Sequence, residues 1–464
     1  MSTTTTTTTT EIPLTDLPGG EQSGEEGRQQ AQLSSFDPTD PDTIIAASRL
    51  ADSQVPDGGY GWVVIFACSV LTFWFVGTSY SWGIIQAALV AEKLSSPSTL
   101  SFVGSLTTSC ISFLALVNAR IVRAIGARKT ALCGVALLGA GEIFSGFSTG
   151  NLGGLFVTAG VIMGVGASLL FMVVSTIPAQ YFNKKRGVAN GIVYAGGGLG
   201  GTIISFAMDS VIQRLGPAWT FRILGLTTIA TGLPAAWLIK ERTPITTATF
   251  VEWRLFANVQ FTTLFLAGTI GTFPLFVPPF FLPLYSTSLR LSPSAGAGLV
   301  AGFNFSSAVG RLACGFLSDY IGPVNTLFIA LLFSALSMLV LWPVSSTLGP
   351  LIAFVIVNGA ANGGFFSTMP TVVGSVFGSR RVGVAMGMIV TGWAGGYLLI
   401  QYLAYEEQQG APIAGFLLEA YGGEHSTLKA YHPAIFYAGA MALAAAALVG
   451  VVRLKIDRRA FRKL

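Results

Sequence analysis

Residues 175–196 read STIPAQYFNKKRGVANGIVYAG, and residues 367–392 read STMPTVVGSVFGSRRVGVAMGMIVTG. Each stretch leaves an apolar segment through Ser-Thr-x-Pro, crosses a short basic turn and enters a second apolar segment. The pair Lys185-Arg186 recurs as Arg380-Arg381, and Ala189-x-Gly191 recurs as Ala385-x-Gly387, with one inserted residue in the second copy. A parallel repeat of this kind predicts a chain built from two similar halves.

Apolar segments that are long enough to cross a bilayer surround both copies. A helix rises 1.5 Å per residue, so about 20 apolar residues span the ~30 Å of hydrocarbon. Twelve such segments lie near residues 62–90, 99–118, 130–148, 153–178, 188–212, 219–239, 260–284, 295–317, 324–344, 349–373, 384–403 and 433–453. We therefore predict an all-α membrane protein with twelve transmembrane helices in two six-helix halves.

The composition argues against other classes of protein. Only 10% of the side chains are charged and the mean hydropathy is +0.66, whereas soluble domains carry about 25% charged residues. A soluble enzyme, a nucleic-acid-binding protein and a secreted disulfide scaffold are therefore excluded. We expect a monomer in the lipid bilayer, without a nucleic-acid partner.

No cofactor or metal is expected from the motifs. The four cysteines have no paired or metal-ligand spacing, and the sequence contains no triphosphate-binding loop. Gly196, Gly198 and Gly201 match a dinucleotide-binding pattern, but they follow an apolar helical run rather than a strand. We interpret these glycines as sites of close helix packing.

The ends of the chain differ from the membrane segments. Residues 1–59 contain eight consecutive threonines and ten acidic but only two basic side chains, which predicts a disordered, acidic cytoplasmic tail. We place the first six-helix half at 60–240, a short cytoplasmic linker at 241–258, the second half at 259–453 and a basic cytoplasmic tail at 454–464.

The basic residues predict the orientation. With both termini in the cytoplasm, eighteen lysines and arginines fall on the cytoplasmic side, and only Lys93, Arg214, Arg290 and Lys429 fall outside. Basic residues favour the cytoplasmic side of membrane proteins. We expect a multi-pass protein of the plasma membrane, with the vacuolar membrane as the alternative.

The repeat and two motifs resemble a known family. Two parallel repeats of six segments, with 315–322 echoing the basic loop at 120–129, resemble the major facilitator superfamily. The stretches 56–64 (PDGGYGWVV) and 181–191 (YFNKKRGVANG) resemble signatures of its monocarboxylate transporter family, in its fungal form. The motif residues are Asp57, Gly58, Gly59, Trp62, Lys185, Arg186 and Gly191.

The resemblance implies a transporter rather than an enzyme. Members of the family are secondary transporters, many of which move small carboxylates with a proton, and fungal relatives include vitamin transporters and exporters of secondary metabolites. We expect secondary active or facilitative transport of a small organic molecule, such as a carboxylate, by alternating access, with a proton as a possible co-substrate. A non-transporting nutrient sensor that signals through the acidic tail is the second hypothesis.

The chain departs from the family pattern at three places. Animal proton-coupled members have a lysine in the outer half of helix 1, whereas residues 80–86 (YSWGIIQ) contain none. The family's helix 8 arginine is matched by Arg311, but the aspartate four residues before it is replaced by Ser307. Residues 400–409 resemble an insertion near the end of helix 11. The first two departures put the family's usual proton coupling in doubt.

Arg311 admits two interpretations. A charge near the bilayer centre costs about 2.5 to 3.5 kcal/mol on insertion scales, and Ser307 offers this arginine no local anion. An anionic substrate could supply one through two hydrogen bonds to the guanidinium. Alternatively, Arg311 belongs to the cytoplasmic gate and pairs with Asp319 or with carbonyls at a helix end.

Other polar residues in the apolar segments are further candidates. Glu142 is the one acid deep inside an apolar span of the first half, so it either carries a proton or simply reaches the membrane interface. Each of the uncharged groups either touches the substrate or bonds between helices. These are Tyr80, Trp82, Gln86, Asn190, Tyr194, Asn304, Ser307, Asn358 and Asn362. We select Arg311, Tyr80, Trp82, Asn304, Ser307 and Asn190 as substrate-binding residues and Glu142 as the proton-coupling candidate.

Overall fold

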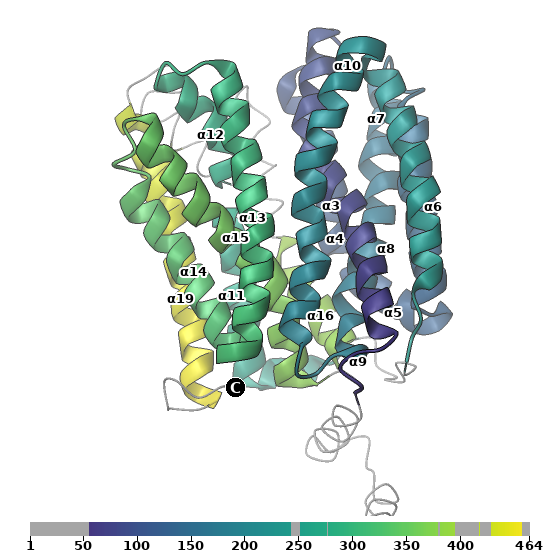
Figure 1. The fold of residues 1–464 in the computed structure, drawn as a ribbon, viewed down its shortest axis with the longest axis vertical. Coiled ribbons are helices and arrows are strands. Elements are labelled where there is room, and N and C mark those ends of the chain that lie inside the picture. The colour runs from purple at the N-terminus through teal and green to yellow at the C-terminus, as the bar shows by residue number, and fades with distance from the viewer. Residues whose placement is uncertain are drawn as a thin grey trace, which may run out of the picture. The chain divides into compact units, whose positions relative to one another are not determined.

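The computed structural model describes residues 55–242, 251–275, 277–378, 381–394, 417 and 428–456. Every described element is a helix (Figure 1), which confirms the all-α fold class. The described residues all belong to one compact unit. The predicted tail at 1–59 lies almost entirely outside the described residues, and so do the insertion at 400–409 and most of the basic tail.

We call residues 55–242 the first half and residues 251–456 the second half. The helices of the first half are α3 (Gly61–Ala91), α4 (Pro97–Phe113), α5 (Ala115–Ile125), α6 (Ala127–Ser145), α7 (Leu152–Leu155), η1 (Phe156–Ile162), α8 (Met163–Thr176), α9 (Pro178–Tyr181) and α10 (Arg186–Leu238). The helices of the second half are η2 (Trp253–Ala257), α11 (Val259–Leu275), α12 (Val277–Ser288), α13 (Pro293–Ile321), α14 (Pro323–Leu336), η3 (Ser337–Leu341), α15 (Leu348–Phe377), α16 (Val382–Gly392), η5 (Leu428–Tyr431) and α19 (His432–Ile456).

The described helices cover each of the twelve predicted segments at least in part. Among the residues described, seven helices are long and apolar enough to cross a membrane, or eight if α4 and α5, which are bent by 60°, count as one span. The number of twelve spans is therefore not confirmed and stays a prediction.

Part of the difference comes from α10, which runs through two predicted segments. Its 53 residues would measure about 80 Å as one straight helix, more than twice the hydrocarbon thickness. Gly216 breaks it with φ 78°, a conformation that glycine adopts without strain. Pro217 then opens the next helix, where its missing N–H costs no hydrogen bond. The segments 188–212 and 219–239 are thus separate helices.

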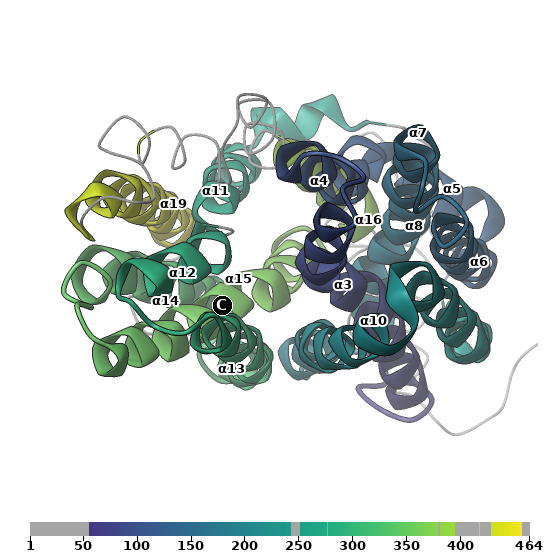
Figure 2. The same cartoon turned by 90° about the horizontal axis from the view of Figure 1, so that it is seen from above.

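Glycines let α10 approach helices of both halves (Figure 2). A Cβ on Gly198 would lie 2.7 Å from the Cβ of Ala308 on α13, and one on Gly201 would lie 3.1 Å from Tyr80 on α3. A Cβ on Gly196 would collide with the main chain of Ser69. The predicted packing role of these three glycines is confirmed.

Candidate functional site

Arg311 lies at the contact between the two halves. It is located about two-thirds along α13 and is 1% exposed. Its Nη1 donates to the main-chain carbonyl of Tyr194 on α10 at 2.7 Å, and its Nη2 donates to the Tyr80 hydroxyl on α3 at 2.9 Å. Both partners belong to the first half, so the guanidinium links the halves directly.

Two aromatic rings bracket this guanidinium. The ring centroids of Tyr80 and Phe366 lie 5.8 and 5.6 Å from Cζ of Arg311, within the range of cation–π attraction. Both aromatic residues are partly exposed, although Arg311 is buried. Tyr80 comes from the first half and Phe366 from the second, so the bracket also spans the contact between halves.

The guanidinium has no acidic partner among the described residues. In the part of the chain that the structure describes, no carboxylate pairs with Arg311, and its Nε has no hydrogen-bond partner. Asp319 instead accepts hydrogen bonds from the main-chain N–H groups of Gly187 at 2.7 Å and Val188 at 2.8 Å. The predicted pairing of Arg311 with Asp319 is therefore wrong. The carbonyl that Arg311 does bind lies inside α10 rather than at its end.

Asn304 and Ser307 lie seven and four residues before Arg311 on α13. This spacing places all three on one face of the helix. Both residues are buried, and Ser307 packs against Gly363 of α15. Of the six predicted substrate-binding residues, the structure therefore brings Tyr80 into contact with Arg311, while Asn304 and Ser307 share the helix of Arg311.

The other two predicted residues lie elsewhere. Asn190 donates to the Thr371 hydroxyl at 2.8 Å, a second link between halves, one turn of α10 before Tyr194. Trp82 donates to the carbonyl of Leu100 at 3.1 Å within the first half. Two further polar candidates bond between helices of the second half. Asn358 donates to the Ser334 carbonyl and to the Ser337 hydroxyl, and Asn362 donates to the Leu275 carbonyl.

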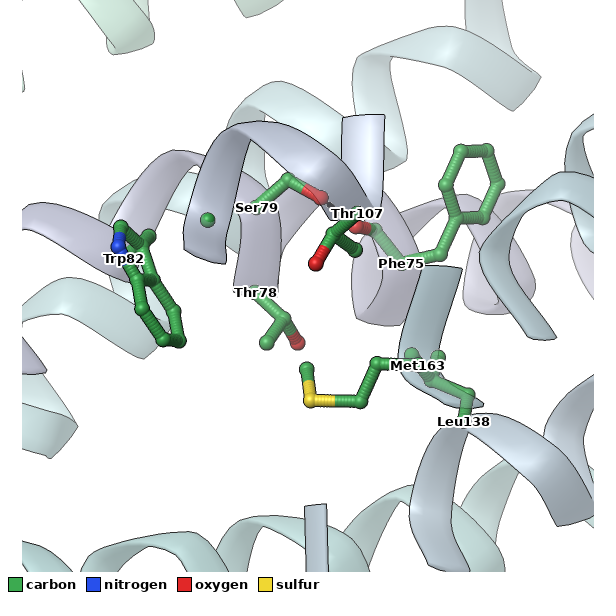
Figure 3. A pocket seen from close by; sticks show the side chains of 8 residues that line it. Phe75, Thr78, Ser79, Trp82, Thr107, Leu138 and Met163 are labelled. Atoms are coloured by element: carbon green, nitrogen blue, oxygen red, sulfur yellow. Dashed lines mark hydrogen bonds between the residues drawn. The ribbon is translucent and has the colours of Figure 1, made fainter. Parts of the chain in front are cut away.

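Trp82 lines a small pocket inside the first half (Figure 3). The pocket is lined by Phe75, Thr78, Ser79, Trp82, Gly104, Thr107, Leu138 and Met163. The hydroxyls of Ser79 and Thr107 donate to the main-chain carbonyls of Phe75 and Ala159 and can only accept further hydrogen bonds. The Thr78 hydroxyl has two acceptors within reach, the carbonyl of Trp74 and Oε1 of Glu142.

Glu142 lies behind this pocket and does not reach the surface. It is completely buried on α6, so the interpretation that it simply reaches the membrane interface is wrong. Its Oε1 lies 3.2 Å from the hydroxyl of Thr78, which lines the pocket. Its Oε2 has no hydrogen-bond partner among the described residues. The carboxylate therefore lies next to the pocket of the first half and, within the described part of the chain, forms no hydrogen bond with the Arg311 site.

An aromatic cluster extends from Phe366 across the contact between halves. The ring centroid of Trp393, the residue that follows α16, lies 6.2 Å from Phe366, 5.7 Å from Phe365 and 5.9 Å from Phe171. Phe171 is on α8 of the first half. We did not predict these residues, because the chain has 33 phenylalanines, most of them in the apolar segments, and their spacing does not distinguish these ones.

The two sequence motifs meet at the start of α10. The Oδ1 atom of Asp57 accepts hydrogen bonds from the main-chain N–H groups of Asn183 and Lys184 at 2.8 Å and of Lys185 at 3.2 Å. The Trp62 ring packs edge-on against Phe182 with centroids 4.8 Å apart. Asp57 and Asp319 thus place two carboxylates at a helix N-terminus, where negative charge is favourable.

Arg186 and Gly191 of the second motif lie at the contact between halves. Arg186 is 3% exposed, donates to the Phe182 carbonyl at 3.0 Å and lies beside Gly374 of α15. Gly191 packs against the main chain of Arg311, where a Cβ would approach the carbonyl oxygen to 2.8 Å. Burial shows that Arg186 is more than a charge that sets orientation.

A family comparison agrees with this geometry. The model of the Major Facilitator Superfamily matches residues 63–401 and also residues 264–463. The chain belongs to the major facilitator superfamily. It is therefore a multi-pass membrane protein and a transporter of this type.

Individual relatives support the same family. The Aspyridones efflux protein apdF of Emericella nidulans is 29% identical over 393 residues, which cover 82% of this chain and 77% of that protein. The Agnestins efflux protein AgnL12 of Paecilomyces divaricatus is 25% identical over 448 residues, covering 92% and 96%. A solved bacterial homologue of the iron transporter ferroportin, in an outward-facing state, has a TM-score of 0.66 at 13% identity and covers 85% of this chain and 100% of that one.

Proposed function

We propose that this transporter moves a small organic anion, with a carboxylate bound by Arg311. One observation carries the proposal: a fully buried guanidinium at the contact between halves has no carboxylate partner among the described residues. Burying an unpaired charge costs several kcal/mol, and an anionic substrate would offset this cost. The sequence resemblance to monocarboxylate transporters supports a carboxylate.

The remaining donors of the guanidinium suit a carboxylate. Of its five N–H groups, one bonds to the Tyr194 carbonyl and one to the Tyr80 hydroxyl. The Nε group is unused, and Nε with one Nη forms the fork that a carboxylate binds through two hydrogen bonds. The hydroxyl of Tyr80 could donate to the same anion, because the hydrogen bond from Arg311 uses only a lone pair of the Tyr80 oxygen and leaves its proton free.

The positions of these partners support transport by alternating access. Arg311 moves with α13 of the second half, while Tyr80 and Tyr194 belong to the first half. If the halves rock against each other, the two hydrogen bonds of Arg311 must break or lengthen. A bound anion would keep the guanidinium neutralised during this step, so the loaded protein would cross the barrier more readily than the empty one.

We further propose that transport runs outward. Two relatives that cover most of this chain are named efflux proteins, for aspyridones and for agnestins. An exporter of an organic acid is consistent both with these names and with the Arg311 site. A vitamin importer of the same fold is the alternative direction.

A deletion strain tests substrate and direction together. Untargeted metabolite analysis of cells and medium should reveal an organic acid that accumulates inside the cells and falls in the medium when the gene is removed. Restoring the wild-type gene should reverse both changes. Depletion of the acid inside the cells would contradict export. A uniquely affected metabolite without any anionic group would contradict the substrate class.

A further inference from the structure

The halves close on each other through two related helix contacts. At the first, α10 meets α13, and a Cβ on Gly315 would lie 3.0 Å from the Cα of Gly191. At the second, α5 meets α16, and a Cβ on Gly387 would lie 3.4 Å from the Cβ of Ala119. An offset of 196 residues relates Gly191 to Gly387 and Ala119 to Gly315. The contacts are therefore equivalent in the two repeats.

One turn further along, the two contacts differ in charge. At the first contact, Asp319 accepts from Gly187 and Val188 at the start of α10. By the same offset, Arg123 is the equivalent of Asp319, and Gly383 at the start of α16 is the equivalent of Gly187. The alignment is secure, because the turn after each helix ends in a glycine with positive φ, Gly126 at 88° and Gly322 at 97°.

Arg123 cannot do what Asp319 does. A helix N-terminus carries partial positive charge and attracts anions, and α16 adds the charge of Arg381 in its N-cap position. An arginine from α5 beside this site would repel it, so closing this contact requires an anion from another part of the chain.

Glu252 supplies that anion. It lies just before η2, in the segment that connects the two halves. Its Oε2 lies 3.7 Å from Nε of Arg381, with only 16% and 14% of the two side chains exposed. Glu252 also acts electrostatically on Arg123. The carboxylate therefore pairs with Arg381 of the second half and lies within electrostatic range of Arg123 of the first half.

We propose that Glu252 is the gate carboxylate of the first repeat, replacing on the connecting segment the aspartate that α5 lacks. It positions α5 against α16 in the closed state and takes no part in substrate recognition. The proposal rests on the alternating-access part of the proposed function. It makes one of the two gate contacts dependent on the segment between the halves.

Separation of the two halves, which opens both contacts, can be measured with a cysteine at Ser318 of the first contact. This residue is 1% exposed on α13 and packs beside Gly187, so it becomes accessible only when the halves separate there. In permeabilised membranes, a polar maleimide labels the Ser318→Cys protein at a rate that reports how often the halves separate. The labelling rate of the parent protein, which has only the native cysteines, is subtracted. We expect Glu252→Gln to raise this rate about two- to fivefold, as expected from the loss of a partly exposed ion pair.

Matched variants separate this role from a general loss of charge. Glu241→Gln removes another carboxylate near the same helix ends, one that accepts from the main-chain N–H of Ala127 within the first half, and should leave the rate unchanged. Adding Arg123→Asp to Glu252→Gln should restore the slow rate, because the introduced carboxylate would then face the start of α16 as Asp319 faces α10.

Three results would overturn the proposal: an unchanged rate in Glu252→Gln, an equal rise in Glu241→Gln, or no restoration by Arg123→Asp. The labelling rate is read without substrate. Failure of anion recognition by Arg311 would therefore leave this test intact, and failure here would leave the substrate proposal intact.

Discussion

At the scale of single residues, Arg311 combines a high desolvation cost with an incomplete set of partners. Its two hydrogen bonds go to uncharged oxygens, those of Tyr80 and Tyr194. Uncharged acceptors orient a guanidinium without cancelling its charge. Under our proposal, an anion would complete this set of partners, and Tyr80 is the residue best placed to sense whether one is bound.

Replacing Tyr80 with phenylalanine should weaken anion recognition. The variant keeps the ring that lies 5.8 Å from the guanidinium but removes the hydroxyl that Arg311 contacts. One hydrogen bond contributes about 1 kcal/mol, so we expect an increase of about fivefold in the apparent KM for the anion, measured by vesicle transport.

Tyr194→Phe is the control for this measurement. Its hydroxyl bonds to Ser175 at 2.7 Å, whereas Arg311 contacts only its main-chain carbonyl. The KM should therefore stay near the wild-type value. An equal rise in both variants would mean that packing, and not the hydroxyl on Arg311, explains the change.

Glu142 leads to a prediction about coupling. The missing helix 1 lysine and Ser307 remove two groups that could link proton binding to anion binding, so an imposed tenfold proton gradient should drive less than about tenfold accumulation of the anion. Any remaining dependence of accumulation on the proton gradient should disappear in Glu142→Gln, because the amide of glutamine cannot carry a proton as the carboxylate does. Transport into vesicles at equal and unequal pH measures both.

Glu92→Gln, which changes an exposed carboxylate at the end of α3, should retain the gradient dependence of the wild type. Accumulation near tenfold would show tight coupling in spite of these departures. A Glu142→Gln protein that remained fully coupled would exclude this residue as the carrier.

At the scale of elements, the start of α10 organises one end of the molecule. Asp57 holds the turn before it, and Asp319 holds its first residues from the other half. Charge-assisted bonds to main-chain N–H groups are among the stronger hydrogen bonds. The two signature stretches therefore form one structural unit.

Removing the carboxylate of Asp57 should lower stability. Asp57→Ala leaves the N–H groups of Asn183 and Lys184 without their acceptor, and the loss of a comparable helix cap costs about 1 to 2 kcal/mol. Thermal unfolding of the detergent-solubilised protein should shift to lower temperature. Asp209→Ala removes an acid that, within the part of the chain the structure describes, accepts only from Gln213 on the same helix. An equal shift in that variant would contradict the account.

The sequence predicts elements better than contacts. Long apolar runs locate the helices because a bilayer imposes length and composition on each of them. The bend between α4 and α5 at Leu114 has no such signal, because neither glycine nor proline lies there. The partner of Asp57 is 126 residues away, and nothing local to either motif connects them.

At the scale of the whole molecule, the repeat predicts which surfaces meet. Glycines at equivalent positions of α10 and α16 face equivalent helices of the opposite half. The candidate site is only partly predictable in this way. Polarity within apolar segments identifies Arg311, Tyr80 and Tyr194, but the same criterion selects Trp82, which faces a pocket of the first half, and overlooks Phe366.

The acidic tail should be dispensable for transport. The site described above lies entirely within residues 55–456, so deletion of residues 1–50 should leave flux per molecule of membrane protein near the wild-type value. A nutrient sensor that signals through the tail would lose its output instead. Substrate flux, together with the transcriptional response to the substrate, distinguishes these outcomes. Loss of the response with no measurable flux in either protein would favour the sensor.

Transport by Arg311→Gln tests the central claim most directly. The substitution removes the positive charge and much of its desolvation cost, so membrane abundance should stay near normal. Flux of the anion identified from the deletion strain should fall about tenfold to a hundredfold, the equivalent of about 1.5 to 3 kcal/mol for hydrogen bonds to a charged group. Undiminished flux at normal abundance would contradict a substrate-binding role for Arg311, and a fall in abundance that matches the fall in flux would assign Arg311 to holding the halves together.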